Sequence, residues 1–334
     1  MTSVPAKASP PKPRRATISD VAEAAGVSRT TVSLVLADHP RITGPTKERV
    51  RKVMQELGYV YNRAATAVRY GKSTLIGLLV TDIRNPFFAE VTMAVDRAVE
   101  EFDTSAILGF SFGSAGRESQ IALSLVEHLI GGLILLPTAE STAAGLACLG
   151  GPRPLALVQL LREVPDLPSD YVGVDNRASG QLLGEHLRNA GLRDALLVGG
   201  DSASAQFNDR LAGLRSGLDG DVRAVLGGAQ GLDAALRAGT PACVVTYNDT
   251  HLLSVMHVLR DRDLEPGRDV AIGSFDNSPL SGEVKPAVTS VDHHAGLLAQ
   301  EAVRLLFARA QDPEREWQRL TVPGALVVRE STQL

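Results

Sequence analysis

The sequence has few cysteines and no long apolar run. Its 334 residues contain two cysteines, Cys148 and Cys243, which lie far apart in apolar stretches. This spacing excludes a disulfide framework and predicts reduced, buried thiols. No stretch approaches 18 uninterrupted apolar residues, so no membrane-spanning helix is expected. The N-terminus lacks the apolar segment of a secretory signal, and we therefore expect a cytoplasmic protein.

The sequence lacks most of the common catalytic and metal-binding motifs. It contains no HExxH or CxxC and no histidines at metal-ligand spacing, and its one GxSxG string is Gly109–Gly113. His293 and His294 are adjacent, so they would point apart, and a solvated loop is a better interpretation than a metal site. Gly71–Thr74 matches the end of a P-loop, but Thr66 stands where the first glycine belongs and a strand follows. We expect no enzyme activity, no cofactor and no metal.

Charge is distributed unevenly along the chain. The net charge is −4, but residues 1–72 contain 13 Lys and Arg against 5 Asp and Glu. A basic N-terminal part on an acidic body favours a protein that presents one end to phosphates. Residues 1–16 have no apolar periodicity and are expected to form a disordered basic arm. Contacts of this arm with DNA and a merely solubilising role both remain open.

Two short helices joined by a tight turn are predicted between Thr17 and Leu36. Thr17 and Asp20 have capping-box spacing, and Gly26 stands where the first helix must end with positive φ. Ser28 is placed to cap the second helix. Two apolar stripes complete the pattern: Val21, Ala22 and Ala25, then Val32, Val35 and Leu36. The stretch therefore predicts a helix-turn-helix, whose second helix would enter a DNA major groove.

A third helix is expected to complete the core of this small domain. Thr43 is placed to cap it, Pro45 falls in its first turn and Gly58 ends it. Its apolar positions are Val50, Val53, Met54 and Leu57. The basic residues near this helix and around the turn are candidate phosphate contacts: Arg29, Arg41, Lys47, Arg49, Arg51 and Lys52, with Arg63 and Arg69 following.

The helix-turn-helix resembles the head of the lactose-repressor (LacI) family of bacterial transcription regulators. The motifs that carry the resemblance are Asp20–Ala22, Ala25–Ser28 and Thr31–Ser33. The resemblance implies a hinge helix in residues 62–72 that folds on DNA and wedges an apolar side chain into the minor groove. Ala65 matches the family here, whereas Val68 replaces the usual leucine and Tyr61 a common proline. The expected DNA-binding residues are Thr17, Ser28, Arg29, Thr30, Thr31, Ser33, Leu34, Asn62, Arg63, Ala65 and Val68.

The remainder of the chain alternates apolar strands with amphipathic helices, beginning at the strand Leu75–Val80. The strands are apolar throughout, as in parallel sheets covered on both faces. One series of strands runs to Leu155–Leu160 and includes a helix over Thr142–Leu149. A second series begins at Tyr171–Val174. A helix over Ala295–Ala310 and a strand pair over Leu320–Arg329 follow.

The resemblance extends through these elements, over residues 17 to 331. Its landmarks are Asn85–Phe88, Arg210–Gly213, Asn248-Asp249, Phe275–Asn277 and Val328–Ser331. It implies an α/β fold: a three-helix head and hinge, then a two-lobed periplasmic-binding-protein-like body of doubly wound parallel sheets. The expected domains are residues 17–61 for the head and 73–334 for ligand binding and dimerisation. Lobe 1 would comprise about 73–172 plus 291–318, and lobe 2 about 173–290 plus 319–334.

A ligand site is expected where the strands of the two lobes end. The expected ligand-binding residues are Asp82, Asn85, Phe87, Phe88, Gln159, Ser204, Gln206, Arg210, Asn248 and Asp276. The resemblance implies that Arg210, Asn248 and Asp276 clamp a polyhydroxylated ligand; a role in capping turns is the alternative, and it is favoured for Asp249. Residues 225–228 lack the aromatic ring that family members often carry there, and Gln159 occupies a position that is often charged.

These observations predict a DNA-binding transcription regulator, most simply a repressor. A small metabolite, a sugar or sugar derivative, would set its affinity for operator DNA. Two heads are needed to bind a near-palindromic operator, so a homodimer is expected. A solute-binding protein for transport shares the two-lobed cleft, but it would need a signal peptide and no DNA-binding head. A regulator with a non-functional cleft is the other alternative.

Overall fold

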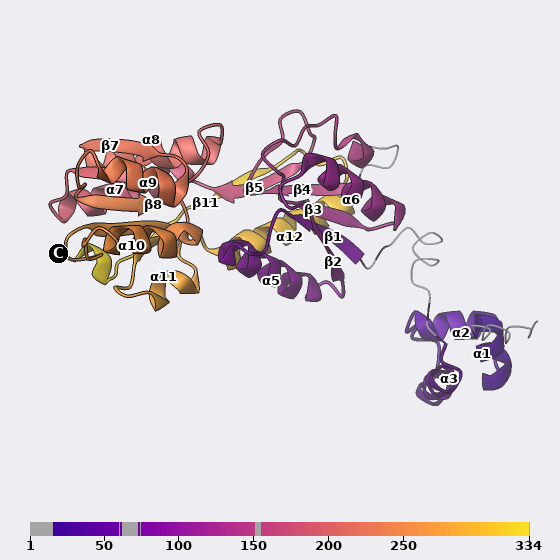
Figure 1. The fold of residues 1–334 in the computed structure, drawn as a ribbon. Helices are drawn as coiled ribbons and strands as arrows, with labels where there is room; N and C mark the ends of the chain where they lie inside the picture. The colour runs from indigo at the N-terminus through magenta and orange to yellow at the C-terminus, as the bar shows by residue number, and fades with distance from the viewer. Residues whose placement is uncertain (1–15, 60, 62–72, 74, 151–154, 334) are drawn as a thin grey trace, which may run out of the picture. The chain divides into compact units, whose positions relative to one another are not determined.

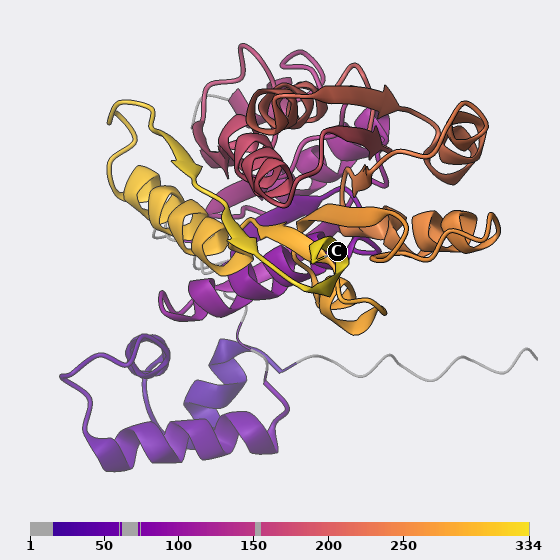
Figure 2. The ribbon, with the colours of Figure 1, turned by 90° about the vertical axis from the view of Figure 1, so that its left-hand side faces the viewer.

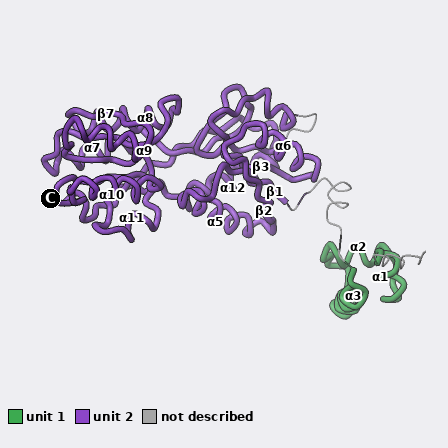
Figure 3. Tube along the Cα trace, viewed as in Figure 1, with its two compact units in different colours: residues 1–70 green, residues 71–334 purple. Residues whose placement is uncertain are grey.

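The computed structural model describes residues 16–59, 61, 73, 75–150 and 155–333. Two compact units make up the chain, residues 1–70 and residues 71–334 (Figure 3). Residues 1–15 of the expected basic arm lie outside the described residues. So does the expected hinge, residues 62–72, with Asn62, Arg63, Ala65 and Val68.

The first unit contains three helices: α1 (Ile18–Ala25), α2 (Arg29–Leu36) and α3 (Gly44–Glu56) (Figure 1). The capping box that begins α1 is formed. The N–H of Asp20 donates to the Thr17 hydroxyl at 3.3 Å, and the Thr17 N–H donates to the Asp20 carboxylate at 2.7 Å. Gly26 ends α1 with φ 62°, and the N–H of Thr31 donates to the Ser28 hydroxyl at the start of α2. The predicted helix-turn-helix is therefore confirmed.

The three helices share one small core. Its fully buried members are Val21, Ala22, Ala25, Val32, Val35 and Val50. Leu57 was expected in this core, but it is 41% exposed because α3 ends one residue before it. Thr43 precedes α3 as expected, yet its hydroxyl bonds to the Thr46 hydroxyl and not to a backbone N–H.

The second unit contains two six-stranded sheets (Figure 1 and Figure 2). Sheet 1 has the order β11-β5-β4-β3-β1-β2, and every pairing is parallel. Helices α5 (Pro86–Glu100) and α12 (Ala295–Gln311) cover one face, and α6 (Ala115–Glu127) covers the other. The strands are β1 (Leu75–Val80), β2 (Ser105–Phe110), β3 (Gly132–Leu135), β4 (Ala156–Leu160), β5 (Asp170–Val174) and β11 (Arg319–Val322).

Sheet 2 has the order β12-β10-β9-β8-β6-β7, and only the β10–β12 pairing is antiparallel. Helices α7 (Asn176–Asn189) and α8 (Ala205–Leu218) cover one face; α9 (Gly228–Leu236) and α10 (Leu252–Arg260) cover the other. A short helix, α11 (Pro279–Glu283), follows β9. The strands are β6 (Asp194–Val198), β7 (Asp221–Val225), β8 (Cys243–Thr246), β9 (Ala271–Asp276), β10 (Thr289–Asp292) and β12 (Ala325–Val327).

The chain passes between the two lobes three times, after β5, after β10 and after β11. Both lobes are therefore discontinuous, but the crossings differ from the expected boundaries. Residues 170–174 form β5 of sheet 1 and do not begin the second series, and β11 also belongs to sheet 1 because it pairs with β5. β11 and β12 thus lie in different sheets instead of pairing with each other, and β10, up to Asp292, belongs to lobe 2.

The expected helix over Thr142–Leu149 is not formed. A single 3-10 turn, Ala147–Gly150, occupies its end. Leu146 and Leu149 from this segment still pack against α6 and the second face of sheet 1. Their burial explains the apolar spacing that suggested a helix.

Helices α7 and α8 pack at unusually short range because glycines face each other. A Cβ added at Gly213 would lie 2.0 Å from the carbonyl oxygen of Arg177, and one at Gly180 would lie 2.3 Å from that of Arg210. Gly184 and Gly217 are equally confined. Only hydrogen side chains allow this separation, so these glycines fix the position of α8 against α7.

In the described part of the chain, no helix combines the length and apolarity needed to cross a bilayer. Within the same residues, no group of three or more His, Cys, Asp or Glu side chains is arranged to hold a metal ion.

The glycine contact predicts a strong effect of a single methyl group. Gly213→Ala should force α7 and α8 apart and lower the free energy of unfolding by about 1–3 kcal/mol, as overpacking does. Gly296→Ala, near the start of α12, has no atom within 4 Å of the new Cβ and should be neutral or slightly stabilising. Urea denaturation of both variants tests this, and equal stabilities would contradict it.

Candidate functional site

Helix α2 presents an exposed face at the surface of the head. Arg29, Thr30 and Ser33 are exposed, and Leu34 is half-buried beside them. The other expected DNA contacts in the head also stabilise helices: Thr17 and Ser28 are the caps of α1 and α2, and the hydroxyl of Thr31 lies 2.9 Å from that of Ser28. The outward face of α2 is therefore the surface available to base edges.

The expected phosphate contacts that the structure describes fall into two groups. Lys47 and Arg51 form ion pairs with Asp38, at 2.9 and 3.1 Å, and Lys52 forms one with Glu56 at 3.9 Å. Lys47 above all lowers the pKa of the Asp38 carboxyl. Arg29, Arg41 and Arg49 are exposed and make no ion pair within the described residues. The first group shapes the surface of the head, and the second is free to meet phosphates.

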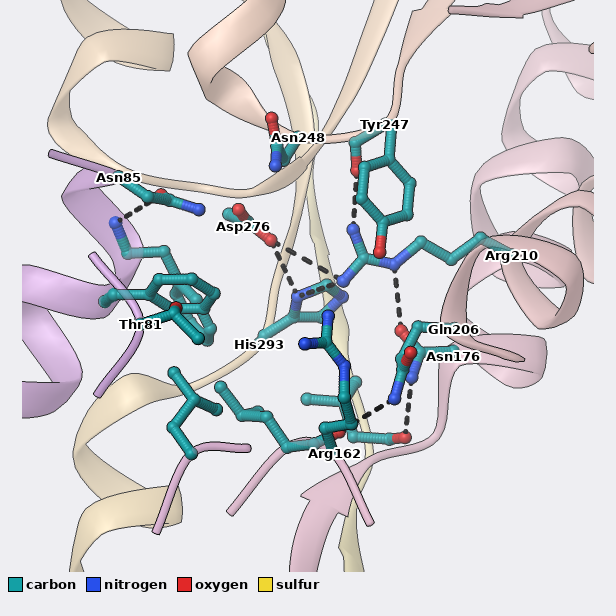
Figure 4. Close-up of a pocket in the computed structure, with 15 residues that line it drawn as sticks. Thr81, Asn85, Arg162, Asn176, Gln206, Arg210, Tyr247, Asn248, Asp276 and His293 are labelled. Carbon is teal, nitrogen blue, oxygen red and sulfur yellow. Dashed lines mark hydrogen bonds and ion pairs between the residues drawn. The ribbon is translucent and has the colours of Figure 1, made fainter. Parts of the chain in front are cut away.

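A cavity of about 230 Å³ lies between the two lobes of the second unit (Figure 4). Parallel strands of both sheets end here, which is the usual ligand site of such folds. The cavity is smaller than the roughly 300–1,000 Å³ of typical ligand pockets. Its lining residues are Thr81, Asn85, Phe87, Phe88, Leu136, Leu161, Arg162, Val174, Asn176, Gln206, Arg210, Tyr247, Asn248, Asp276 and His293.

Arg210 is buried in the wall of this cavity, on the first half of α8. Its Nε donates to the Asn176 side-chain oxygen at 2.8 Å, and its Nη1 donates to the carbonyl of Tyr247 at 2.6 Å. The guanidinium lies over the rings of Tyr247 and Phe275, at 4.8 and 4.9 Å from their centroids. These contacts hold the cation in one orientation.

Asp276 faces Arg210 from the end of β9. The carboxylate lies 3.6 Å from Arg210 Nη2, and both side chains are more than nine-tenths buried. The backbone of Asp276 has φ 95°, a conformation that L-residues rarely adopt. The strand end therefore holds this carboxylate at the cavity at a cost in backbone strain.

His293 is fully buried beside this pair, so the expectation of a solvated loop at His293-His294 was wrong for His293. Its Nδ1 lies 3.2 Å from Asp276 Oδ1, and its ring packs edge-on against Phe87 with centroids 5.9 Å apart. Burial and the charge of Arg210 lower the pKa of His293, so the ring is neutral near pH 7. His294 is partly exposed and pairs with Asp292 at 3.5 Å.

The other residues expected at the ligand site separate into two groups. Asn85, Phe87, Phe88, Gln206 and Asn248 line the cavity together with Arg210 and Asp276. Asn85 also caps α5, and the Gln206 amide donates to the carbonyl of Leu161 across the lobes at 3.3 Å.

Asp82, Gln159 and Ser204 do not line this cavity. Asp82 is held by Arg84, at 2.6 Å, which lowers the pKa of Asp82. Gln159 is buried and anchors a loop by accepting from the Val164 N–H at 2.6 Å. Ser204 caps α8 and donates to Gln206 at 2.8 Å.

Several lining residues were absent from the sequence prediction: Thr81, Leu136, Leu161, Arg162, Val174, Asn176, Tyr247 and His293. All lie within a few residues of a strand end, so the rule that strand ends form the site could have included them. Among them, Tyr247 brings an aromatic ring to the cavity, and this ring lies against Arg210 and Phe207.

Asp249 lies behind the cavity and organises the turn after β9. Its carboxylate accepts hydrogen bonds from the Ser274 hydroxyl and from both the N–H and the hydroxyl of Ser278. Burial, and next the charge of Asp276, raise the pKa of Asp249 to about 6. This residue supports the site without lining it.

Comparison with known proteins agrees with both halves of the structure. Residues 17–62 match the model of the bacterial regulatory proteins of the lacI family, and residues 185–332 match a periplasmic binding protein-like domain. The HTH-type transcriptional regulator PtxS of Pseudomonas plecoglossicida is 32% identical over 332 residues, which cover 96% of each chain. The chain belongs to the LacI family. It is thus a DNA-binding transcription regulator and not a transport protein.

Solved LacI-family structures share the fold. The lac repressor dimer bound to operator and the anti-inducer ONPF is 23% identical, with a TM-score of 0.82, and the match covers 96% of this chain and 100% of that one. The complex of the regulator CelR with cellobiose is 27% identical, with a TM-score of 0.68 over 95% of this chain and 100% of that one.

The raised pKa of Asp249 predicts a pH-dependent stability. The folded state holds this proton more tightly than the unfolded chain, so the stabilisation is complete below about pH 4 and is lost as the pH rises through about 6. A rise from 3.8 to about 6 corresponds to roughly 3 kcal/mol. Urea denaturation should show a loss of that order between pH 4 and 7 in the wild type, relative to Asp249→Asn. Parallel pH profiles would contradict this assignment.

Proposed function

We propose that this LacI-family regulator binds a small polar metabolite, a sugar or sugar derivative, in the interlobe cavity. Binding there sets its affinity for operator DNA. The observation that carries the proposal is the buried Arg210–Asp276 pair, which is held rigidly in a cavity whose walls come from both lobes. The CelR complex with cellobiose supports a carbohydrate as the ligand class.

The polar lining has the character of a sugar site. Asparagine and glutamine side chains supply both donors and acceptors, and Phe87 and Phe88 supply apolar surface. Hydroxyl groups need such paired donors and acceptors, and a sugar ring has an apolar face that aromatic side chains cover. The small cavity favours a ligand of monosaccharide size over a disaccharide.

A ligand in this position can act as a switch because it touches both lobes. Asn85 and Phe88 belong to lobe 1, which the head precedes in sequence, whereas Arg210 and Asp276 belong to lobe 2. A ligand shifts an equilibrium only through unequal affinity for its two states. One that bridges the lobes favours their closed arrangement, and the change in lobe 1 would reach the paired heads through the hinge.

The regulator is proposed to act as a homodimeric repressor on a near-palindromic operator, without enzyme activity. The lac repressor of similar fold is a dimer on its operator. In this chain, β2 is the edge strand of sheet 1, and its Ile107 and Leu108 are exposed. An edge strand with exposed apolar side chains is a surface that proteins normally cover, here by the second copy. The location that this function implies is the cytoplasm, at the nucleoid when bound to operator.

Removing Asp276 should separate ligand response from DNA binding. Asp276→Ala should still bind an operator selected from random DNA, but the sugar that releases the wild type should no longer act at the same concentration. Loss of a buried charged partner costs about 2–5 kcal/mol, which is about 30-fold or more in affinity. Operator binding titrated with ligands from a sugar panel measures this, with Asp82→Ala as the matched control outside the cavity. An unchanged response in Asp276→Ala would refute the assignment of Asp276 and place the ligand site elsewhere, whereas a wild type that responds to no sugar of the panel would favour a non-functional cleft.

Arg29 is proposed to read a base at the start of the recognition helix α2. Arg29→Ala should relax specificity at one base pair and cost about 1–3 kcal/mol on the preferred operator. Arg49→Ala removes the same charge from an exposed position on α3 and should weaken binding to all sequences equally. Affinities for a set of single-base operator variants test both residues. A uniform loss with Arg29→Ala would make it a phosphate contact.

A further inference from the structure

The charges that line the cavity are unbalanced and are separated between the lobes. Lobe 2 contributes Arg210 and Asp276, which face each other. Lobe 1 contributes one charged residue, Arg162, which lies two residues beyond the end of β4. His293 is neutral near pH 7, so the lining has one cation in excess.

Arg162 has no carboxylate partner of its own. Its Nη1 donates to the carbonyl of Pro137 at 2.8 Å, and no carboxylate of the described residues lies within ion-pair distance. The charge of Arg162 acts on the buried carboxylate of Glu118, but the two oxygens of that carboxylate accept from the Thr138 N–H and the Ser141 hydroxyl. Figure 4 shows the Arg162 side chain among those that surround the cavity. Its other guanidinium N–H groups are available to a ligand.

The wall that lobe 2 contributes has negative character at Asp276. Asp276 uses one oxygen, Oδ1, for Arg210 and His293, and its Oδ2 makes no hydrogen bond or ion pair within the described residues. Burial above all, and then neighbouring negative charge that includes Asp276, raise the pKa of Asp249 and of Glu90, so further negative charge would be unfavourable here. This wall suits hydroxyl groups, which can donate to Asp276.

We propose that the ligand is a monosaccharide-sized hydroxy acid, whose carboxylate binds Arg162 and whose hydroxyl groups bind Asp276. This inference rests on the proposed function of the cleft and specifies its ligand class. A planar guanidinium binds a carboxylate through two parallel hydrogen bonds, and a neutral sugar cannot replace that interaction. Because Arg162 is on lobe 1 and Asp276 on lobe 2, such a ligand ties the lobes together by its two ends.

The test compares each neutral sugar with its acid. Calorimetry on the full chain would measure D-glucose against D-gluconate and D-glucuronate, D-galactose against D-galacturonate, and the corresponding 6-phosphates. We expect at least one acid to bind ten-fold or more tightly than its neutral counterpart. In Arg162→Gln this preference should fall to within about three-fold, and Arg162→Lys should keep part of it. Arg84→Gln removes an equal charge from the same lobe outside the cavity and should bind like the wild type.

Three results would overturn the proposal. The first is that a neutral sugar or a sugar phosphate binds most tightly. The second is that Arg162→Gln loses equal affinity for the acid and the neutral sugar while its melting temperature is unchanged. The third is that none of the acids binds at 10 mM. Measuring operator binding as well distinguishes the hydroxy-acid ligand from the regulatory role of the cleft. A neutral sugar that releases DNA would refute the hydroxy acid and leave the regulatory cleft standing. An acid that binds through Arg162 without changing operator affinity would refute the regulatory role alone.

Discussion

The rest of the cleft depends on a single buried cation, the guanidinium of Arg210. Two aromatic rings lie near its faces, an amide and a backbone carbonyl accept hydrogen bonds from its N–H groups, and the Asp276 carboxylate forms an ion pair with it. A charge this far from water is tolerated only when nearly all of its donors are used. Its partners come from α7, from the segment after β8 and from β9, so the arginine also connects the elements that form the wall of lobe 2.

The backbone of Arg210 also depends on the close packing of two helices. The carbonyl oxygen of Arg210 lies against Gly180, so the side chain can reach its partners only while α7 and α8 stay in close contact. On the opposite wall, Asn85 caps α5 and thereby places Phe87 and Phe88. The positions of these cavity side chains are thus set by the cap of α5 and by the close packing of α7 against α8.

The head could be predicted from the sequence because its signals are local. A capping box, a glycine with positive φ and a second cap act over three or four residues, and all were found as predicted. The alternation of strands and helices predicted two lobes for the same reason. The lobe boundaries were harder, because only pairing with β5 shows that β11 belongs to the first sheet, and pairing is a long-range property.

The site was predicted in part, for a related physical reason. Arg210, Asp276, Asn85 and Asn248 were expected at the cavity and line it. Strand ends predict which residues come near the cleft but not which way they turn. Asp82 forms an ion pair with Arg84 outside the cavity, and Gln159 accepts a hydrogen bond from the Val164 N–H within lobe 1. His293 is the reverse case, because its burial depends on Phe87 and Asp276, which are distant in sequence.

The threefold passage between lobes has a consequence for biosynthesis. Helix α12 covers one face of sheet 1 together with α5, and its Leu298, Ala302 and Leu306 share a core with β1, β3 and β4, which precede them by more than 130 residues. Sheet 1 is completed by β11 and sheet 2 by β12, the last two strands of the chain. On the ribosome, a nascent chain therefore presents an open apolar sheet face until α12 has emerged. The head needs only residues 17–59 to close its core and can fold first. Neither lobe has its full set of strands until the C-terminal segment is made.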